Sequence, residues 1–252
     1  MQIVLDSGKF SDMIRIISMF DGLCNDLIIN EGIIRQRSND KISVFDIDMR
    51  PILEEITLPL SNFKQKLELL KTFIGQEVTI SANDTDFTIA DQHSSLKVKY
   101  PNPDFIDNKF ITEKDLESVV DTSKENFILE TSISKIISER IKTYAKTFNM
   151  WDLILVFEGE TAKILIETEA KDQSALFLSG IPTNKQLEFY TDVSVIPFII
   201  DHDSDISLNV FEGENEKTLN RFVTTCADVD IKIYCRSLVK EREWKYDNSQ
   251  RP

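Results

Sequence analysis

The sequence predicts an α+β protein made of two similar halves, each built from antiparallel sheets with helices on one face. Three observations support this prediction. Apolar strands that end in Glu-Gly occur half a chain apart, at Asp26 to Gly32 and at Asp152 to Gly159. Each of these strands follows an amphipathic helical pattern. Each half then closes with three short strands, and such runs of neighbouring strands are typical of antiparallel sheets.

Three apolar stripes at helical spacing predict the long helices. The stripe over residues 9–20 consists of Phe10, Met13, Ile14, Ile17 and Phe20. The stripe over residues 60–74 consists of Phe63, Leu67, Leu70 and Ile74. The stripe over residues 132–148 consists of Ile133, Ile137, Ile141, Tyr144 and Phe148. A fourth, short helix is predicted within Val193 to Ile200, where Pro197 limits its length.

Short apolar or alternating segments predict the strands. In the first half these segments are Ile33 to Arg37, Lys41 to Met49, Glu54 to Leu58, Glu77 to Ala82, Phe87 to Asp91 and Leu96 to Tyr100. In the second half they are Asp152 to Gly159, Ala162 to Thr168, Ala175 to Ser179, Leu187 to Tyr190, Ile206 to Phe211, Leu219 to Thr225 and Val229 to Cys235.

The halves are separated where two prolines, Pro101 and Pro103, interrupt the last strand of the first one. We therefore expect a first domain over residues 1–100, an interdomain connector over 101–124, a second domain over 125–238 and a charged tail over 239–252. A chain of 252 residues suits two domains of ordinary size.

Composition argues against an enzyme, a cofactor and a metal site. Cys24, Cys226 and Cys235 form no C-x-x-C pair and are expected to be reduced thiols. His93 and His202 lack the spacing of metal ligands, and the sequence has no phosphate-binding or nucleophile motif. No apolar run approaches the roughly 20 residues that span a bilayer. The first residues do not form a secretory signal, so we expect a cytoplasmic protein without membrane contact.

The distribution of charge is more informative than its total. The net charge of −14 argues against nucleic acid, because phosphates repel it. The three long helical windows, however, carry +1, +2 and +3, which leaves −20 on the rest of the chain. On any one helix, exposed lysine is ordinary solubilising charge. Three basic helices at related positions of an acidic repeat favour a surface for sequence-independent contact with DNA phosphates.

These features together resemble a DNA polymerase sliding clamp with two domains per subunit, as in proliferating-cell nuclear antigen and the clamp of T-even phages. The resemblance covers residues 2–238 and rests on architecture, since this family has no sharp motif. It implies a homotrimeric ring whose helices line the hole and which encircles double-stranded DNA. The ring tethers a DNA polymerase and is placed on DNA by a clamp loader. The short second helix of the second half is more similar to the phage form, which favours a viral or phage protein in the host cytoplasm.

The resemblance also implies two kinds of site residue. Cations that face the DNA would be Lys9, Arg15, Lys64, Lys66, Lys71, Lys135, Arg140, Lys142 and Lys146. An apolar pocket for partner peptides, beneath the connector, would be lined by Ile42, Leu116, Val119, Val120 and Leu238, with Phe105 and Phe110 nearby. Ordinary core packing explains each of these apolar residues equally well.

Other functions remain open at this stage. The chain also fits an acidic structural or interaction module, such as a phage assembly protein or a DNA-mimicking inhibitor, although a mimic has no use for basic helices. A monomeric processivity factor that holds DNA by charge alone is a further alternative, and a carboxylate hydrolase lacks any clustered motif. The acidic run Asp201 to Asp205 with Glu212 resembles a calcium loop, but Ile206 stands where such a loop needs glycine. We expect an acidic turn there.

Overall fold

The chain alternates many short strands with a few helices, in an order that repeats. The computed structural model describes residues 1–39, 41, 43–100, 110–119, 127–150, 152–158, 161–167, 173–178, 188–212 and 217–238. The first half contains β1 (Gln2–Leu5), α1 (Ser7–Ser18), β2 (Leu27–Ile29), β3 (Ile33–Arg37), β4 (Ser43–Asp48), α2 (Arg50–Leu53), β5 (Leu58–Leu60), α3 (Phe63–Lys71), β6 (Val78–Ala82), β7 (Asp86–Ala90) and β8 (Ser95–Lys99).

The second half repeats this order. After the connecting helix α5 (Glu113–Val119), it contains β9 (Phe127–Ile133), α6 (Lys135–Phe148), β10 (Asp152–Glu158), β11 (Thr161–Glu167), β12 (Gln173–Leu178), β13 (Glu188–Ser194), α7 (Ile196–Ile199), β14 (Ile206–Glu212), β15 (Lys217–Cys226) and β16 (Val229–Leu238). Each half thus runs strand, long helix, several strands, helix and three closing strands, with α2 as an addition to the first half. The α+β fold is as predicted.

All strand pairs within the described residues are antiparallel, and they form four sheets. The orders are β1-β6-β7-β8, β12-β11-β10-β13, β3-β4-β16-β15-β14-β9 and the pair β2-β5. The six-stranded sheet joins the two halves, because β4 of the first pairs with β16 of the second from Ile47↔Ile231 to Ser43↔Cys235. The predicted domain boundaries stay predictions, since residues 101–109, 120–126 and 239–252 lie outside the described part of the chain.

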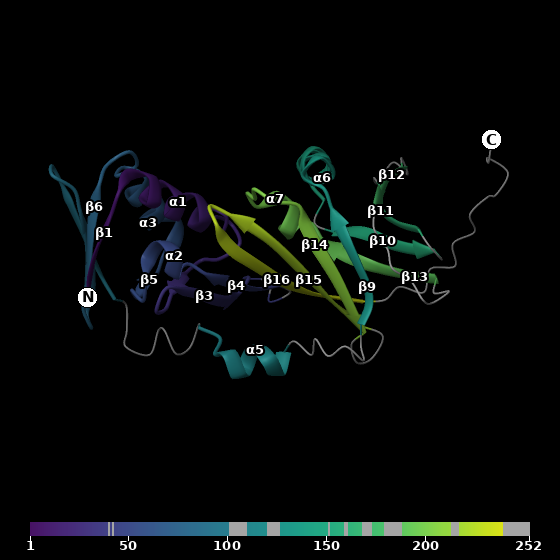
Figure 1. Ribbon diagram of the computed structural model, residues 1–252, viewed down its shortest axis with the longest axis horizontal. Helices are drawn as coiled ribbons and strands as arrows, with labels where there is room; N and C mark the ends of the chain where they lie inside the picture. The colour runs from purple at the N-terminus through teal and green to yellow at the C-terminus, as the bar shows by residue number, and fades with distance from the viewer. Residues whose placement is uncertain are drawn as a thin grey trace.

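The helices lie on two sides of this central sheet. Figure 1 shows α1, α3, α6 and α7 along one side, while α5 lies alone on the other. Alternation along the strands agrees with this arrangement: Phe45 and Ile233 belong to the large core, whereas their neighbours Val44 and Tyr234 belong to a separate small cluster. We call the side with α1, α3, α6 and α7 the helical face and the side with α5 the outer face.

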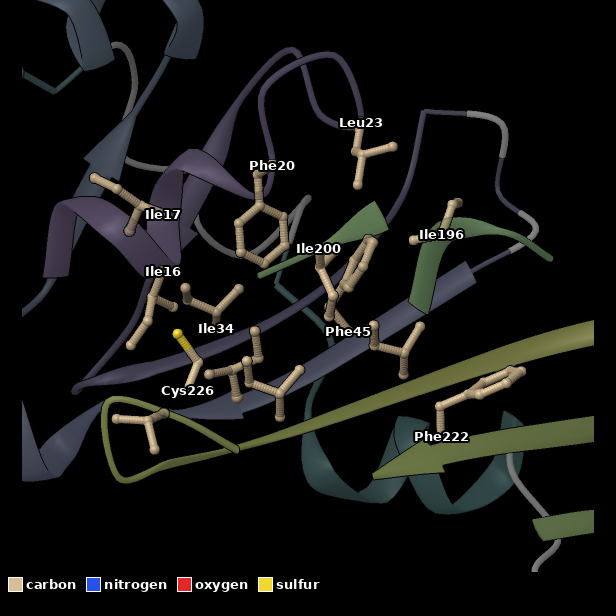
Figure 2. Packing of buried hydrophobic residues seen from close by; sticks show 14 of the residues in the cluster. Ile16, Ile17, Phe20, Leu23, Ile34, Phe45, Ile196, Ile200, Phe222 and Cys226 are labelled. Atoms are coloured by element: carbon tan, nitrogen blue, oxygen red, sulfur yellow. The ribbon is translucent and has the colours of Figure 1, made fainter. Parts of the chain in front are cut away.

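The large core lies under the helical face and runs through both halves. Phe20 and Phe45 meet edge to face with their ring centroids 4.9 Å apart, and Phe198 and Phe222 do so at 5.7 Å. Figure 2 shows this core where residues that follow α1 reach the strands of the central sheet. The three cysteines, Cys24, Cys226 and Cys235, are buried and form no disulfide. Burial raises the pKa of the Cys226 thiol to about 11, which keeps it protonated.

Local sequence sets the helix ends. Asp6 caps α1 by accepting a hydrogen bond from the backbone N–H of Lys9 at 2.9 Å. Ser134 caps α6 in the same way through Ile137, and Asn149 ends α6 in the left-handed conformation. No helix among the described residues is long and apolar enough to cross a membrane.

One predicted strand is wrong. Glu54 to Leu58 is not a strand; the chain forms the short helix α2 before it, and β5 begins only at Leu58. Pro51 favours this helix because proline fits the first turn, where its missing N–H is not needed. Glu54 then ends the helix at a φ of 53°. Its carbonyl lies so close to Gly32 that a Cβ there would be 1.9 Å away, so this turn requires glycine.

The predicted apolar stripes agree with the structure in the middle of each helix and differ from it at the helix ends. Phe63, Leu67 and Leu70 of α3 are buried, but Ile74 lies beyond the helix and is 48% exposed. Phe148 is the last residue of α6 and is 47% exposed, while Ile133 is buried in β9 rather than in the helix. A helical pattern does not show where a helix stops, and these two ends are set by Thr72 and Asn149.

Candidate nucleic-acid interface

The predicted DNA-facing cations lie on α1, α3 and α6, the three longest helices of the helical face (Figure 1). Five of them are exposed and form no ion pair within the described residues, and these are Lys9, Lys64, Lys135, Arg140 and Lys146. Exposed cations without a protein partner keep their charge available to an external anion. Because α1 and α3 come from the first half and α6 from the second, both halves contribute to this set.

Three further lysines are less available. Lys71 donates to Glu68 of its own helix at 2.7 Å, and Lys142 pairs with Glu139 at 3.7 Å. Such neighbours on one helix are only weakly held, so a phosphate can compete with them. Lys66 is half-buried and its Nζ donates to the hydroxyl of Ser61 at 2.7 Å. Burial lowers the pKa of Lys66.

Arg15, the remaining predicted cation, is committed to carboxylates of the other half. Its Nε donates to Asp201 at 2.6 Å, and its two terminal nitrogens donate to Asp203 at 3.0 and 2.8 Å. Asp203 also accepts the backbone N–H of Ala227 at 2.8 Å. These charge-assisted bonds hold the pKa of Asp203 at about 2. We call Arg15, Asp201 and Asp203 the Arg15 latch. Its bonds link α1 to the second half, and they use the guanidinium nitrogens of Arg15.

The acidic run that follows α7 therefore has structural partners. Besides the two latch carboxylates, Asp205 accepts the backbone N–H of Lys135 at the start of α6 at 2.9 Å. His202 is buried; its Nδ1 donates to the carbonyl of Ser204 at 2.9 Å, and its Nε2 bonds with the hydroxyl of Ser138 of α6 at 2.7 Å. The described residues contain no cluster of three metal-ligating side chains.

A second candidate surface lies on the outer face. Ile111 and Leu116, at 9% and 8% exposure, pack α5 and the residues before it onto an apolar patch of the central sheet. We call the whole cluster the connector patch, and it consists of Val44, Ile111, Leu116, Phe211, Leu219 and Tyr234. The backbone N–H of Ile111 also donates to the carbonyl of Arg35 on the edge strand β3 at 2.8 Å. Burial raises the pKa of Tyr234.

Of the predicted pocket residues, Leu116 is in the connector patch. Val119 is the last residue of α5, Leu238 ends β16, and Phe110 is half-buried just before the patch. Ile42, Val120 and Phe105 lie outside the described residues. The sheet side of the patch was missed, and it comprises Val44, Phe211, Leu219 and Tyr234. The period-two alternation along β4 and β16 carries the signal for Val44 and Tyr234, since each stands on the otherwise charged face of its strand, Val44 beside Asp46 and Tyr234 beside Lys232.

Antiparallel sheets continuous across two similar halves, with the helices gathered on one side, define the fold of a DNA sliding clamp. Solved structures of proliferating-cell nuclear antigen (PCNA) from archaea have this fold. PCNA of Thermococcus kodakaraensis matches with a TM-score of 0.61 at 11% identity, over 95% of this chain and 99% of that one. A. fulgidus PCNA bound to the C-terminal region of FEN-1 matches with a TM-score of 0.60 at 12% identity, over 96% and 98%.

A third match is a chain of the PCNA2–PCNA3 complex from Sulfolobus tokodaii, with a TM-score of 0.60 at 9% identity, over 94% of this chain and 99% of that one. No protein-family model matches the sequence, and no curated protein matches it significantly. The likeness is therefore one of fold, and it extends over nearly the whole of each chain.

Proposed function

We propose that this protein is a DNA sliding clamp, a non-enzymatic ring that encircles duplex DNA and tethers a polymerase. The observation that carries the proposal is that the clamp fold spans nearly the whole chain while the helical face presents exposed cations from both halves. In a ring that face would line the hole. Sparse lysines suit sliding, because each is a flexible point charge rather than a rigid bidentate clamp.

The internal repeat supports a way for the ring to close. Within the chain, β16, the last strand of the second half, pairs with β4 of the first half. The counterparts of these strands are β8 and β12, which are edge strands within the described sheets. We propose that β8 of one subunit pairs with β12 of the next, so that every junction in the ring repeats the same antiparallel pairing. Closure of this kind removes open sheet edges, and three two-domain subunits give six similar segments.

The connector patch is the proposed docking site for partner proteins on the outside of the ring. A short partner segment with apolar side chains would bind beside α5, where Leu116 and Ile111 meet the sheet. A clamp loader and a polymerase are the partners that the proposed role requires, and the short α7 favours a viral clamp in the host cytoplasm.

Retention on circular DNA tests the proposal. A closed ring should remain on nicked circular duplex DNA in high salt and slide off when the circle is cut, whereas charge-only binding falls steeply with salt on both forms. That second result would instead support a monomeric processivity factor.

A triple charge reversal identifies the DNA-facing side. Changing Lys64, Lys135 and Lys146 to Glu should impair loading and retention. The matched control reverses Arg37, Lys41 and Arg50, which are also exposed but lie outside both the three basic helices and α5. Equal losses in both triple variants would contradict the assignment of the helical face to DNA.

A further inference from the structure

A hollow on the exposed side of α6 combines apolar and cationic side chains. Its volume is about 520 Å³, and it is lined by Lys135, Ile136, Glu139, Arg140, Thr143 and Tyr144. Ile136 is 70% exposed, more than any other large apolar side chain in the described residues. Contact with phosphate gives no reason for such exposure, because a phosphate gains nothing from an isoleucine.

An aromatic surface borders the hollow. The rings of Tyr144 and Phe148 lie one helical turn apart, with centroids 6.3 Å apart and planes 18° from parallel. Tyr144 is half-buried against the core, and Phe148 is 47% exposed. Leu69 of α3 and Ile74 just after it, at 44% and 48%, are also exposed. Exposed apolar groups thus accompany the cations on these helices.

The rim of the hollow is cationic. Lys135 and Arg140 are exposed on it without an ion pair among the described residues, and Lys146 lies further along the same helix. The one carboxylate on the rim, Glu139, pairs with Lys142 at 3.7 Å. An occupant that suits this site has a flat apolar part beside a negatively charged group.

A nucleotide with an unstacked base has this combination, and a duplex does not, because its bases are stacked inside and only phosphates reach a helix outside the grooves. We propose that the α6 hollow binds unpaired nucleotides of single-stranded nucleic acid. The base lies against Ile136 and Tyr144, and the phosphates lie against Lys135 and Arg140. Aromatic stacking beside a positive track is the general way in which proteins hold single strands without reading their sequence.

This site goes beyond encirclement and does not depend on it. It contacts a single strand rather than a duplex, and its described lining comes from one helix of one subunit. In the proposed ring it would face the hole, because α6 belongs to the helical face. In a chain that does not close into a ring, it would still bind a single strand.

Fluorescence anisotropy with a labelled oligodeoxythymidylate and a duplex of equal length tests this inference. Ile136→Ser should weaken single-strand binding about tenfold, which corresponds to the loss of one stacked base, and leave duplex binding unchanged. At high salt, which screens the phosphate contacts, both proteins should bind the oligonucleotide more weakly, and the tenfold difference should remain because it arises from an apolar contact. Tyr144→Leu, which removes the ring and keeps an apolar side chain, should act in the same direction.

Ile74→Ser is the matched control, since Ile74 is exposed but lies outside the hollow; it should bind both DNAs as the unchanged protein does. Ile136 is so exposed that its replacement should not disturb folding, which an unchanged melting temperature verifies. Unchanged single-strand binding, or equal loss of single-strand and duplex binding, would overturn the inference. So would a loss of polymerase binding alone, which would assign the hollow to a protein. Retention of Ile136→Ser on circular duplex DNA reports separately on the ring.

Discussion

The two faces of the central sheet differ in how they are covered. On the helical face, helices from both halves cover one continuous core that includes Phe45 and Ile233. On the outer face, α5 and the residue Ile111 cover four sheet residues, among them Val44 and Tyr234, the chain neighbours of those core residues. Burial of apolar area is the main source of stability, so the helical face holds the fold together. We therefore expect the outer face to contribute less than the helical face to the free energy of unfolding.

The largest expected effect comes from a substitution in the core under the helical face. Phe45→Ala removes a ring that packs on Phe20 with centroids 4.9 Å apart, and should lower the free energy of unfolding by about 3–5 kcal/mol. Val44→Ala, one residue away on the outer face, should lower it by only about 1–2 kcal/mol. Urea unfolding of both variants measures this difference. Equal losses would mean that the two faces contribute alike and would break the comparison.

The next effect concerns the cover of the outer face. Leu116→Ala removes one of the two apolar side chains that, among the described residues of the connector, pack in the connector patch. The substitution should lower the free energy of local detachment of α5 by about 1–3 kcal/mol. The global free energy of unfolding should change little, because the large core is untouched. Hydrogen exchange should then quicken at α5 and stay slow in β4 and β16. Quickened exchange in those strands as well would show that the outer face supports the sheet.

A smaller effect is expected from the Arg15 latch, which links the two halves. Arg15→Gln removes the Arg15 latch and should cost about 1 kcal/mol near neutral pH, because Arg15 and both carboxylates are partly exposed. The pKa of Asp203, about 2, lies below its ordinary value of 3.8, so the bond stabilises the fold fully above about pH 4. That contribution is lost as pH falls from about 4 to about 2.

Acid unfolding of the two proteins measures this contribution. The stability difference between the unchanged protein and Arg15→Gln should therefore disappear over that interval. Lys9→Gln, which removes an exposed cation of the same helix, is the control and should show no such dependence. A difference at pH 2 as large as the difference at pH 7 would contradict the latch.

How far sequence reasoning reached depended on whether a feature is local. Periodicity found the long helices and most of the strands, because spacing along the chain determines which side chains share a face. The same pattern grouped Arg15 with the other helical cations, since it contains no information about Asp201 and Asp203, nearly two hundred residues away. Partners far apart in sequence decide whether a charge is free, and only the fold shows them.

The connector patch shows the same limit. Leu116 was named from its position in the connector, as the resemblance to a sliding clamp implied, and it is buried in the connector patch. The four sheet residues beneath it were missed because each belongs to a different strand, and the alternation along one strand does not show which strands lie side by side. Ile136 belongs to none of the predicted apolar stripes. Its proposed role in binding depends on its neighbours in the hollow, which only the structure shows.

The solution mass tests the central claim, ring closure, most directly. Light scattering at micromolar protein should give three times the 29.0 kDa of one chain, and the value should hold on dilution through that range. The pairing of β8 with β12 of the next subunit accounts for this stability. A mass of 29.0 kDa at the same concentrations would contradict ring closure, and the clamp assignment would then fail even though the fold is that of a clamp.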